Sequence, residues 1–162
     1  MPLREQVLRI LAARDAVVRL RSRVEADPRR PTDSNAEHDW APVEILAHCA
    51  EMLPYWLGEV ERVLDGWPEP VPFGRVATDP IRTLTVDRDR SLPPATLYEK
   101  LGAGVDRVSV RLLELDDRQA AKRGLHPSRG EMPVTEIVER FLVGHLEEHA
   151  AQLAETLGEA PA

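Results

Sequence analysis

The sequence predicts an all-α protein, a four-helix bundle with a long connection between the second and the third helix. Two observations support this fold class. Apolar residues recur at steps of three and four in four separate segments, which is the spacing of an amphipathic helix. A proline-rich stretch, residues 66–92, separates the second segment from the third, and no segment shows a convincing strand pattern.

The first helix is predicted over residues 7–24, where arginines stand between the apolar positions Val7, Ile10, Leu11, Val17, Val18 and Val24. The stretch that follows, "ADPRRPTDSNAEHD", is dense in Pro, Asp, Ser and Asn. This composition is typical of a loop, so residues 26–39 are predicted to connect the first two helices.

The second helix is predicted from about Ala41 to Asp65, with Gly66 at its end. Pro42 suits the first turn, where the missing N–H has no partner to lose. Pro54 lies inside the helix and is predicted to kink it, because the proline ring removes one backbone hydrogen bond.

Residues 66–92 carry four prolines and no helical period, so they are predicted to form a connection across one end of the bundle. The third helix is predicted from the series Leu97, Leu101, Val105, Val108, Leu112 and Leu115. The fourth is predicted from Val134, Val138, Phe141, Leu142, Leu146 and Leu153.

Length and composition limit the function. At 162 residues the chain is predicted to form one domain, residues 1–162. Its 28 acidic and 21 basic residues give a formal net charge of -7, which argues against unaided binding to nucleic acid or an anionic membrane. No apolar run approaches the roughly 18 residues that span a bilayer, and the first residues do not resemble a signal peptide. A cytoplasmic protein whose partners are small molecules or proteins is therefore predicted.

Two histidines four residues apart, His145 and His149, lie in the fourth predicted helix. Because a helix turns by about 100° per residue, both fall within about 40° of the centre of the apolar stripe. On the second helix, His48 falls about 80° from the centre of the stripe, from where a side chain can face a neighbouring helix.

Three imidazoles form a complete protein shell for a divalent metal that keeps one exchangeable position, as catalytic sites do. The single Cys49 forms no internal disulfide and no cysteine cluster, so histidine and carboxylate are the only candidate ligands. Spacing and facing leave a second interpretation open: buried histidines that are satisfied by hydrogen bonds to acids such as Glu51 or Glu148.

Glu148 and Glu51 are the candidate catalytic residues. Glu148 lies about 60° from His145 on the helix and Glu51 lies one turn from His48, so either can orient an imidazole or act as a base. A solvated helix acid is the more common role for each. Cys49 lies on the apolar stripe of the second helix and is interpreted as a buried apolar residue. Two loop histidines are predicted to lie on the surface: His38 and His126.

Two stretches resemble the DinB-like family. "WAPVEILAHCAEMLPYW" is similar to the second-helix signature of that family, and "LHPSRGEMPVTEIVERFLVGHLEEHAAQL" is similar to its last helix, in which H-x-x-x-H precedes Gln-Leu. The resemblance covers the chain from Trp40 to Leu153. The family usually has Ser or Thr after the Trp, where this chain has Ala41, which affects the helix cap and not the histidines.

The resemblance implies an up-up-down-down four-helix bundle, often a homodimer, with zinc, nickel or a similar divalent ion on His48, His145 and His149. Members and relatives include thiol S-transferases that use bacillithiol or mycothiol, a mycothiol-dependent isomerase, and proteins without a known activity.

Two functions follow as hypotheses. The first is a metal-dependent enzyme that adds a low-molecular-weight thiol to an electrophilic small molecule, or a hydrolase that uses water instead. The alternative is a non-catalytic dimeric bundle with a stress-related role, which binds metal or sequesters a ligand. A cavity that opens onto the histidines distinguishes the two, because structural metal sites are closed.

Overall fold

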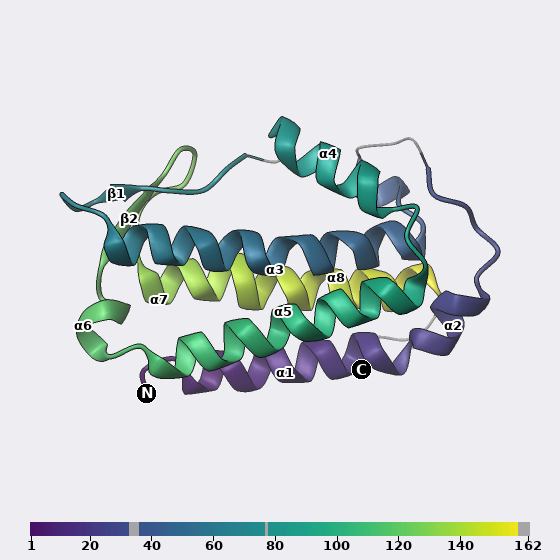
Figure 1. Ribbon diagram of the computed structural model, residues 1–162, viewed down its shortest axis with the longest axis horizontal. Coiled ribbons are helices and arrows are strands. Elements are labelled where there is room, and N and C mark those ends of the chain that lie inside the picture. Colours follow the sequence, from purple (N-terminus) through teal and green to yellow (C-terminus); the bar gives the residue numbers. More distant parts are fainter. Residues whose placement is uncertain (33–35, 77, 159–162) are drawn as a thin grey trace.

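The computed structural model describes residues 1–162 apart from 33–35, 77 and 159–162. The three residues 33–35 belong to the predicted first loop and lie outside the described part. Four long helical segments pack into a bundle (Figure 1), which confirms the predicted all-α class and the four-helix bundle. They are α1 (Arg4–Arg19), α3 (Pro42–Asp65), α5 (Pro94–Glu114) and a last segment made of α7 (Val134–Ile137), η2 (Val138–Gly144) and α8 (His145–Thr156).

The helix directions follow an up-down-down-up order and not the up-up-down-down order that the resemblance implies. Tyr98, at the start of α5, donates a hydrogen bond of 2.9 Å to the carbonyl of Val17 near the end of α1, so these two helices are antiparallel. Arg9 of α1 pairs with Glu139 of η2 at 2.6 Å, so α1 and the last segment run in parallel. Figure 1 shows α3 and α5 side by side and both running against α1.

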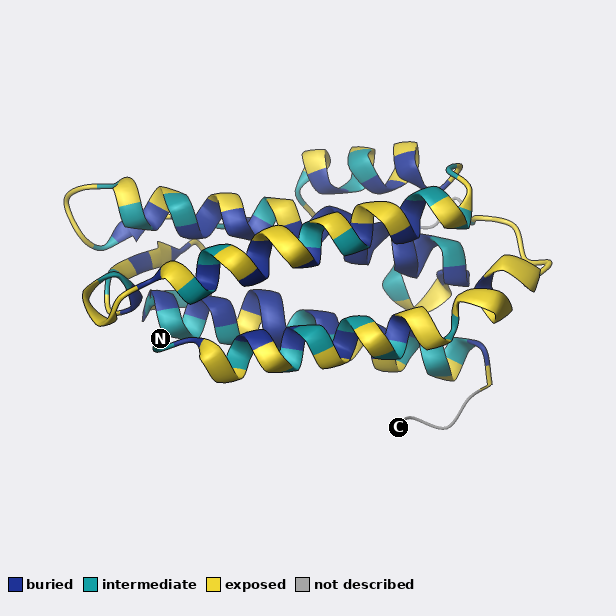
Figure 2. Ribbon diagram, turned by 60° about the horizontal axis from the view of Figure 1, so that its bottom comes forward, coloured by how far each residue is buried: buried dark blue, intermediate teal, exposed yellow. Residues whose placement is uncertain are grey.

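Apolar side chains on the inner faces of the four segments form the core. Figure 2 shows the buried residues on the faces turned toward the other helices. The stripe predicted for the second helix is buried throughout: Ile45, Cys49, Met52, Trp56, Val60 and Val63. None of the described helices is both long and apolar enough to cross a membrane.

The ends of the helices agree with the sequence for α3 and less well elsewhere. Helix α3 begins at Pro42 and ends at Asp65, as predicted. The first predicted helix is divided into α1 and a short α2 (Arg21–Ala26). Between α5 and the last segment lies another short helix, α6 (Asp117–Ala120).

The last segment is not a regular α-helix. Its middle, η2, is a π-helix of seven residues. A π-helical turn forms hydrogen bonds from residue i to i+5 and so accommodates an extra residue, which changes the direction in which the following side chains point. Both predicted histidines, His145 and His149, come after this turn, in α8.

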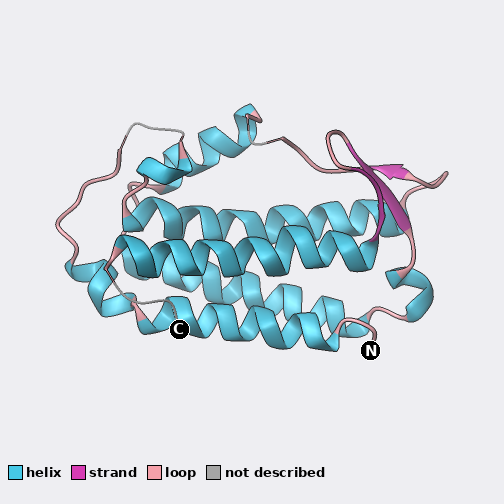
Figure 3. Cartoon of the chain, turned by 180° about the vertical axis from the view of Figure 1, so that it is seen from behind, coloured by secondary structure: helices cyan, strands magenta, loops and turns pink. Residues whose placement is uncertain are grey.

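The connection between α3 and α5 is long, as predicted, but contains regular structure that the sequence analysis missed. Helix α4 (Pro80–Asp89) follows the N-cap residue Asp79, whose carboxylate accepts hydrogen bonds from the backbone N–H groups of Ile81 and Arg82. A small sheet lies at one end of the bundle (Figure 3), in which β2 (Arg123–His126) pairs with β1 (Val71–Pro72) in parallel and with β3 (Gly130–Pro133) antiparallel.

Buried polar contacts fix the start of α3, which carries the first site histidine. The carboxylate of Glu44 is fully buried and accepts hydrogen bonds from the backbone N–H groups of Ala41, at 3.0 Å, and Thr32, at 2.8 Å. Arg90, just after α4, pairs with the same carboxylate at 3.0 Å. Glu44 thus satisfies the N–H of the N-cap residue Ala41, as the third residue of a capping box does, and ties the first loop and the end of α4 to α3.

Candidate metal centre

The structure brings the three predicted histidines together. One ring nitrogen of each lies within 4.8 Å of those of the other two, and Nε2 of His48 is 3.1 Å from Nε2 of His145. His48 and His149 are buried, and His145 is half-buried. Bonds of about 2.1 Å to a tetrahedral metal place ligand nitrogens about 3.4 Å apart, so the His48–His145 distance is close to that of two ligands on one ion.

The arrangement follows from the packing of α3 against α8. His145 and His149 are four residues apart and therefore lie one above the other on the same face of α8. His48 lies in the second turn of α3, and its ring centroid is 5.0 Å from that of His145 and 4.7 Å from that of His149. Two helices thus contribute to one cluster.

Polar side chains lie next to the Nδ1 atoms of two of the rings, His149 and His48. Nδ1 of His149 lies 2.8 Å from the side-chain oxygen of Gln152, and the amide nitrogen of Gln152 donates to the carbonyl of Glu37 at 2.7 Å. A Gln oxygen only accepts, so His149 carries its proton on Nδ1 and leaves the Nε2 lone pair for the cluster. Nδ1 of His48 lies 3.3 Å from Oε2 of Glu51, outside hydrogen-bond geometry. The Nε2 atom of the same ring faces the cluster.

Burial keeps two of the imidazoles in the neutral form that can bind a metal ion. Desolvation, followed by repulsion from the other histidines, lowers the pKa of His145 to about 2. Desolvation also lowers the pKa of His48 well below its ordinary value. Both rings are therefore neutral at physiological pH, which is the form that donates a lone pair to a metal. Imidazole ligands suit zinc or nickel, which favour nitrogen donors.

Two of the three histidines, His145 and His149, each line a cavity. One has a volume of about 660 Å³ and is lined by His145, and the other has a volume of about 870 Å³ and is lined by His149. Glu37, Arg82 and Glu148 line both. The cluster therefore lies at the meeting point of two open spaces, and a ligand can approach it from outside.

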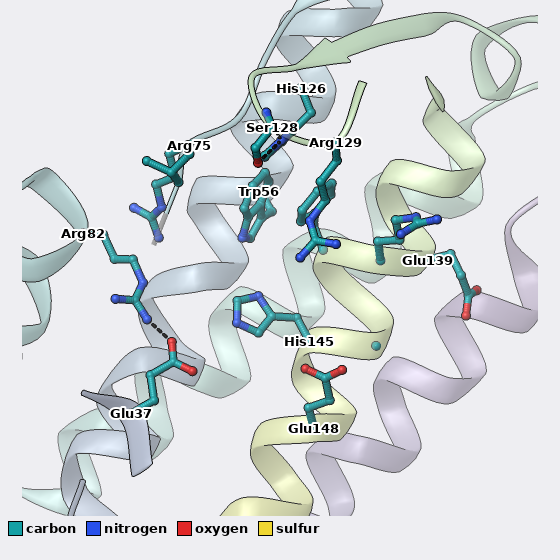
Figure 4. A pocket seen from close by; sticks show the side chains of 14 residues that line it. Glu37, Trp56, Arg75, Arg82, His126, Ser128, Arg129, Glu139, His145 and Glu148 are labelled. Atoms are coloured by element: carbon teal, nitrogen blue, oxygen red, sulfur yellow. Dashed lines mark hydrogen bonds and ion pairs between the residues drawn. The ribbon is translucent and has the colours of Figure 1, made fainter. Parts of the chain in front are cut away.

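Several charged side chains surround His145 in the first cavity (Figure 4). Arg75 and Arg82 lie on one side of the ring and Arg129 on the other, while Glu148 lies on the side away from Arg129. Arg82 pairs with Glu37.

The two predicted catalytic acids occupy different positions. Glu148 is exposed and lines both cavities next to His145 and His149. Glu51 is buried behind His48, pairs with Arg75 at 2.5 Å and lines neither cavity. Burial raises the pKa of Glu51, and the charge of Arg75 opposes this shift. The guanidinium of Arg75 is also stacked 3.6 Å from the centre of the Tyr55 ring.

The prediction for the two loop histidines holds for one of them. His38 is exposed, as predicted. His126 is buried instead, because it lies at the end of β2 and its ring stacks on Phe141, with ring centres 5.0 Å apart and an interplanar angle of 15°. Desolvation lowers the pKa of His126.

Four residues around the histidines were not identified from the sequence: Glu37, Arg75, Arg82 and Gln152. For Gln152 a signal exists, because it lies three residues after His149 on the same helix and hydrogen-bonds to it. The others lie in the two long connections, where no periodicity indicates which way a side chain faces.

Cys49 is a buried residue, and we expect its thiol to be unreactive in the folded protein. Its side chain is fully buried, and desolvation raises its pKa to about 12. At pH 8 roughly one thiol in 10,000 is then ionised. Iodoacetamide at pH 8, followed by mass spectrometry, should leave native protein unmodified and label urea-unfolded protein completely. Rapid labelling of native protein would show that the α3 packing opens.

Comparisons with known proteins agree with this fold. A sequence model of the DinB superfamily matches residues 8–153. A mutant of the mycothiol-dependent maleylpyruvate isomerase superimposes with a TM-score of 0.70 at 16% identity, over 100% of this chain and 63% of that one. YfiT from Bacillus subtilis, described as a probable metal-dependent hydrolase with an unusual four-helix bundle topology, superimposes with a TM-score of 0.65 at 16% identity, over 96% of this chain and 89% of that one. This chain thus spans less than two thirds of the isomerase. No curated protein matches the sequence.

Proposed function

Since the chain belongs to the DinB superfamily, we propose that it is a metal-dependent enzyme that adds a low-molecular-weight thiol to an electrophilic small molecule. The observation that carries this proposal is the cluster of His48, His145 and His149 at the meeting point of two open cavities. A structural metal site is closed by its ligands, whereas a catalytic site keeps a position for water or substrate.

The three histidines would hold the ion. Gln152 orients His149 through a hydrogen bond, and the carboxylate of Glu51 lies 3.3 Å from Nδ1 of His48. A divalent ion at this site supplies positive charge that lowers the pKa of a thiol and stabilises the anion. Glu148, at the edge of both cavities, accepts the thiol proton. The sulfur then bonds to the electrophilic carbon, and the electron pair displaced from that carbon takes up a proton from solvent.

Hydrolysis is a second candidate reaction, with water in place of the thiol. Its support is the description of YfiT as a metal-dependent hydrolase, and the support for thiol chemistry is the mycothiol dependence of the isomerase. A non-catalytic bundle, in which the ion only ties α3 to α8, is less well supported because the cluster is accessible from both cavities. We propose zinc or nickel as the ion, mycothiol or bacillithiol as the thiol, and a cytoplasmic homodimer as the working form.

Metal analysis combined with an activity screen tests the proposal. We expect about one divalent ion per chain in purified protein, and turnover of at least one electrophile in the presence of mycothiol or bacillithiol, with ester and amide substrates included for the hydrolase. Chelation should abolish turnover, and the ion should restore it. Bound metal without turnover across the panel would favour the non-catalytic bundle, and absence of metal would overturn both.

A further inference from the structure

The indole of Trp56 is a buried hydrogen-bond donor without a partner. The residue is 4% exposed, and its ring stacks on Phe141 with ring centres 4.3 Å apart. Its Nε1 has no hydrogen-bond acceptor among the described residues, although almost all buried polar groups in proteins have one. Trp56 lines the first cavity, and Figure 4 shows its nitrogen turned toward the space above His145. A ligand atom in this space is therefore a candidate acceptor.

A second donor faces the same space. Arg129 lies on the turn between β2 and β3, and Figure 4 shows its guanidinium directed into the cavity on the side of His145 away from Glu148. It forms no hydrogen bond or ion pair with the part of the chain that the structure describes. The other three arginines of the cavity are paired: Arg75 with Glu51, Arg82 with Glu37 and Arg140 with Glu136. Arg129 alone thus has its donors free for a ligand.

The charges around the cavity favour a single negative charge on that ligand. Among the lining arginines, Arg129 is the one without an acidic partner in the described part of the chain, so the subsite offers one unmatched positive charge. Glu148 repels an anion from the opposite side of His145, so the negative group has one favourable place, beside Arg129.

We propose that Trp56 and Arg129 form a carboxylate-binding subsite, and that the electrophilic substrate is a small monocarboxylate. This inference rests on the proposed function for the nature of the reaction. The indole N–H and the guanidinium fork donate to the two carboxylate oxygens, and a planar carboxylate suits the fork. A phosphate dianion suits this subsite less well, because Arg129 is the one unmatched positive side chain that it offers. The carbon next to the carboxylate then lies over His145, beside the metal centre.

Titration with propionate, followed by ¹⁵N–¹H NMR of the indole groups, tests the subsite. The chain has three tryptophans, and Trp56→Phe identifies the signal of Trp56 while it preserves the stack on Phe141. In zinc-loaded protein we expect propionate to shift the Trp56 signal to saturation, and to leave the signals of Trp40 and Trp67 in place. Propionamide, which is neutral and of the same shape, should cause no shift.

Two variants test Arg129 directly. We expect Arg129→Gln to raise the Kd for propionate at least about tenfold, because the strong charge-assisted bonds are lost. Arg140→Gln, a control on the same cavity that removes an arginine already paired with Glu136, should change the Kd less than twofold. The remaining signals of each spectrum report whether the variant is folded.

A Trp56 signal that does not respond to propionate, or that responds equally in Arg129→Gln or with propionamide, would overturn the subsite. The same titration in chelated protein separates this result from the proposed function. If the Trp56 signal responds through Arg129 in a protein that has neither metal nor turnover, the subsite is supported and the proposed enzymatic function is contradicted. If the protein shows metal-dependent turnover but no response of the Trp56 signal, the proposed function is supported and the subsite is contradicted.

Discussion

The His149→Ala protein should lose its metal and, with it, its activity. His149 supplies one of three nitrogens in the cluster, and its Nδ1 is already occupied by Gln152. We expect the metal content to fall from about one ion per chain to less than a tenth, and turnover to fall by more than about a hundredfold, since even the loss of an outer-shell partner costs 10–100-fold. Metal analysis and turnover measured on the same preparations check both effects.

Two further variants serve as comparisons for His149→Ala. Glu148→Gln should keep its metal, because the side chain is exposed and not part of the cluster, and should lower the rate if Glu148 is the base. His38→Ala removes an exposed histidine and should behave like the parent. Circular dichroism should show an intact bundle in all three, because alanine and glutamine are good helix formers at positions 149 and 148 and His38 is exposed outside the bundle helices. Full metal content in His149→Ala would remove this residue from the ligand set.

Glu51→Gln should weaken both metal binding and the fold. The carboxylate lies 3.3 Å from Nδ1 of His48 and pairs with Arg75, and the side chains of Glu51 and Arg75 are about 95% buried. Neutralising Glu51 leaves the charge of Arg75 buried without its partner, which typically costs about 3–5 kcal/mol of unfolding free energy. The loss of support for His48 should reduce metal affinity by about 10–100-fold.

Denaturant unfolding and competition with a chelating dye measure these two effects. Glu25→Gln is the matched control, because Glu25 pairs with Arg21 on the surface and should contribute less than about 1 kcal/mol. If Glu51 were instead the catalytic base, its replacement would lower the rate of the fully loaded enzyme and leave metal affinity unchanged. That outcome would contradict the positioning role.

That His145 and His149 share one face of α8 was predictable from the sequence, because a spacing of four residues within a regular helix sets it. Their direction relative to Val134 was not predictable, because the π-helical turn before them is left out of a rotation of 100° per residue. His48, expected at the edge of the apolar stripe, is fully buried, because the rings of Trp40, His145 and His149 pack against it. Periodicity carries no information about helix direction, so the up-down-down-up order could not be read from it.

The positions of residues in the irregular connections could not be predicted from the sequence, because these segments have no regular period. Arg75 and Glu37 reach the site through loop geometry, and their positions depend on which helices the loops cross. The strand β1 has two residues and pairs with β2 more than 50 residues away, so no local alternation marks it. Helix α4 has a capping Asp79 and a proline in its first turn, signals that the proline count of the whole connection obscured.

The π-helical turn makes the number of residues in the last segment part of the site. In helical proteins, insertions and deletions are generally tolerated in the loops and not within the helices. Here the loss of one residue between Val138 and Gly144 would turn η2 into ordinary α-helix and rotate His145 and His149 by about 100° relative to Val134, away from His48. Length within this helix is therefore under the same constraint as the identity of the histidines, and a relative with the H-x-x-x-H motif but one residue fewer before it would place that motif on a different face.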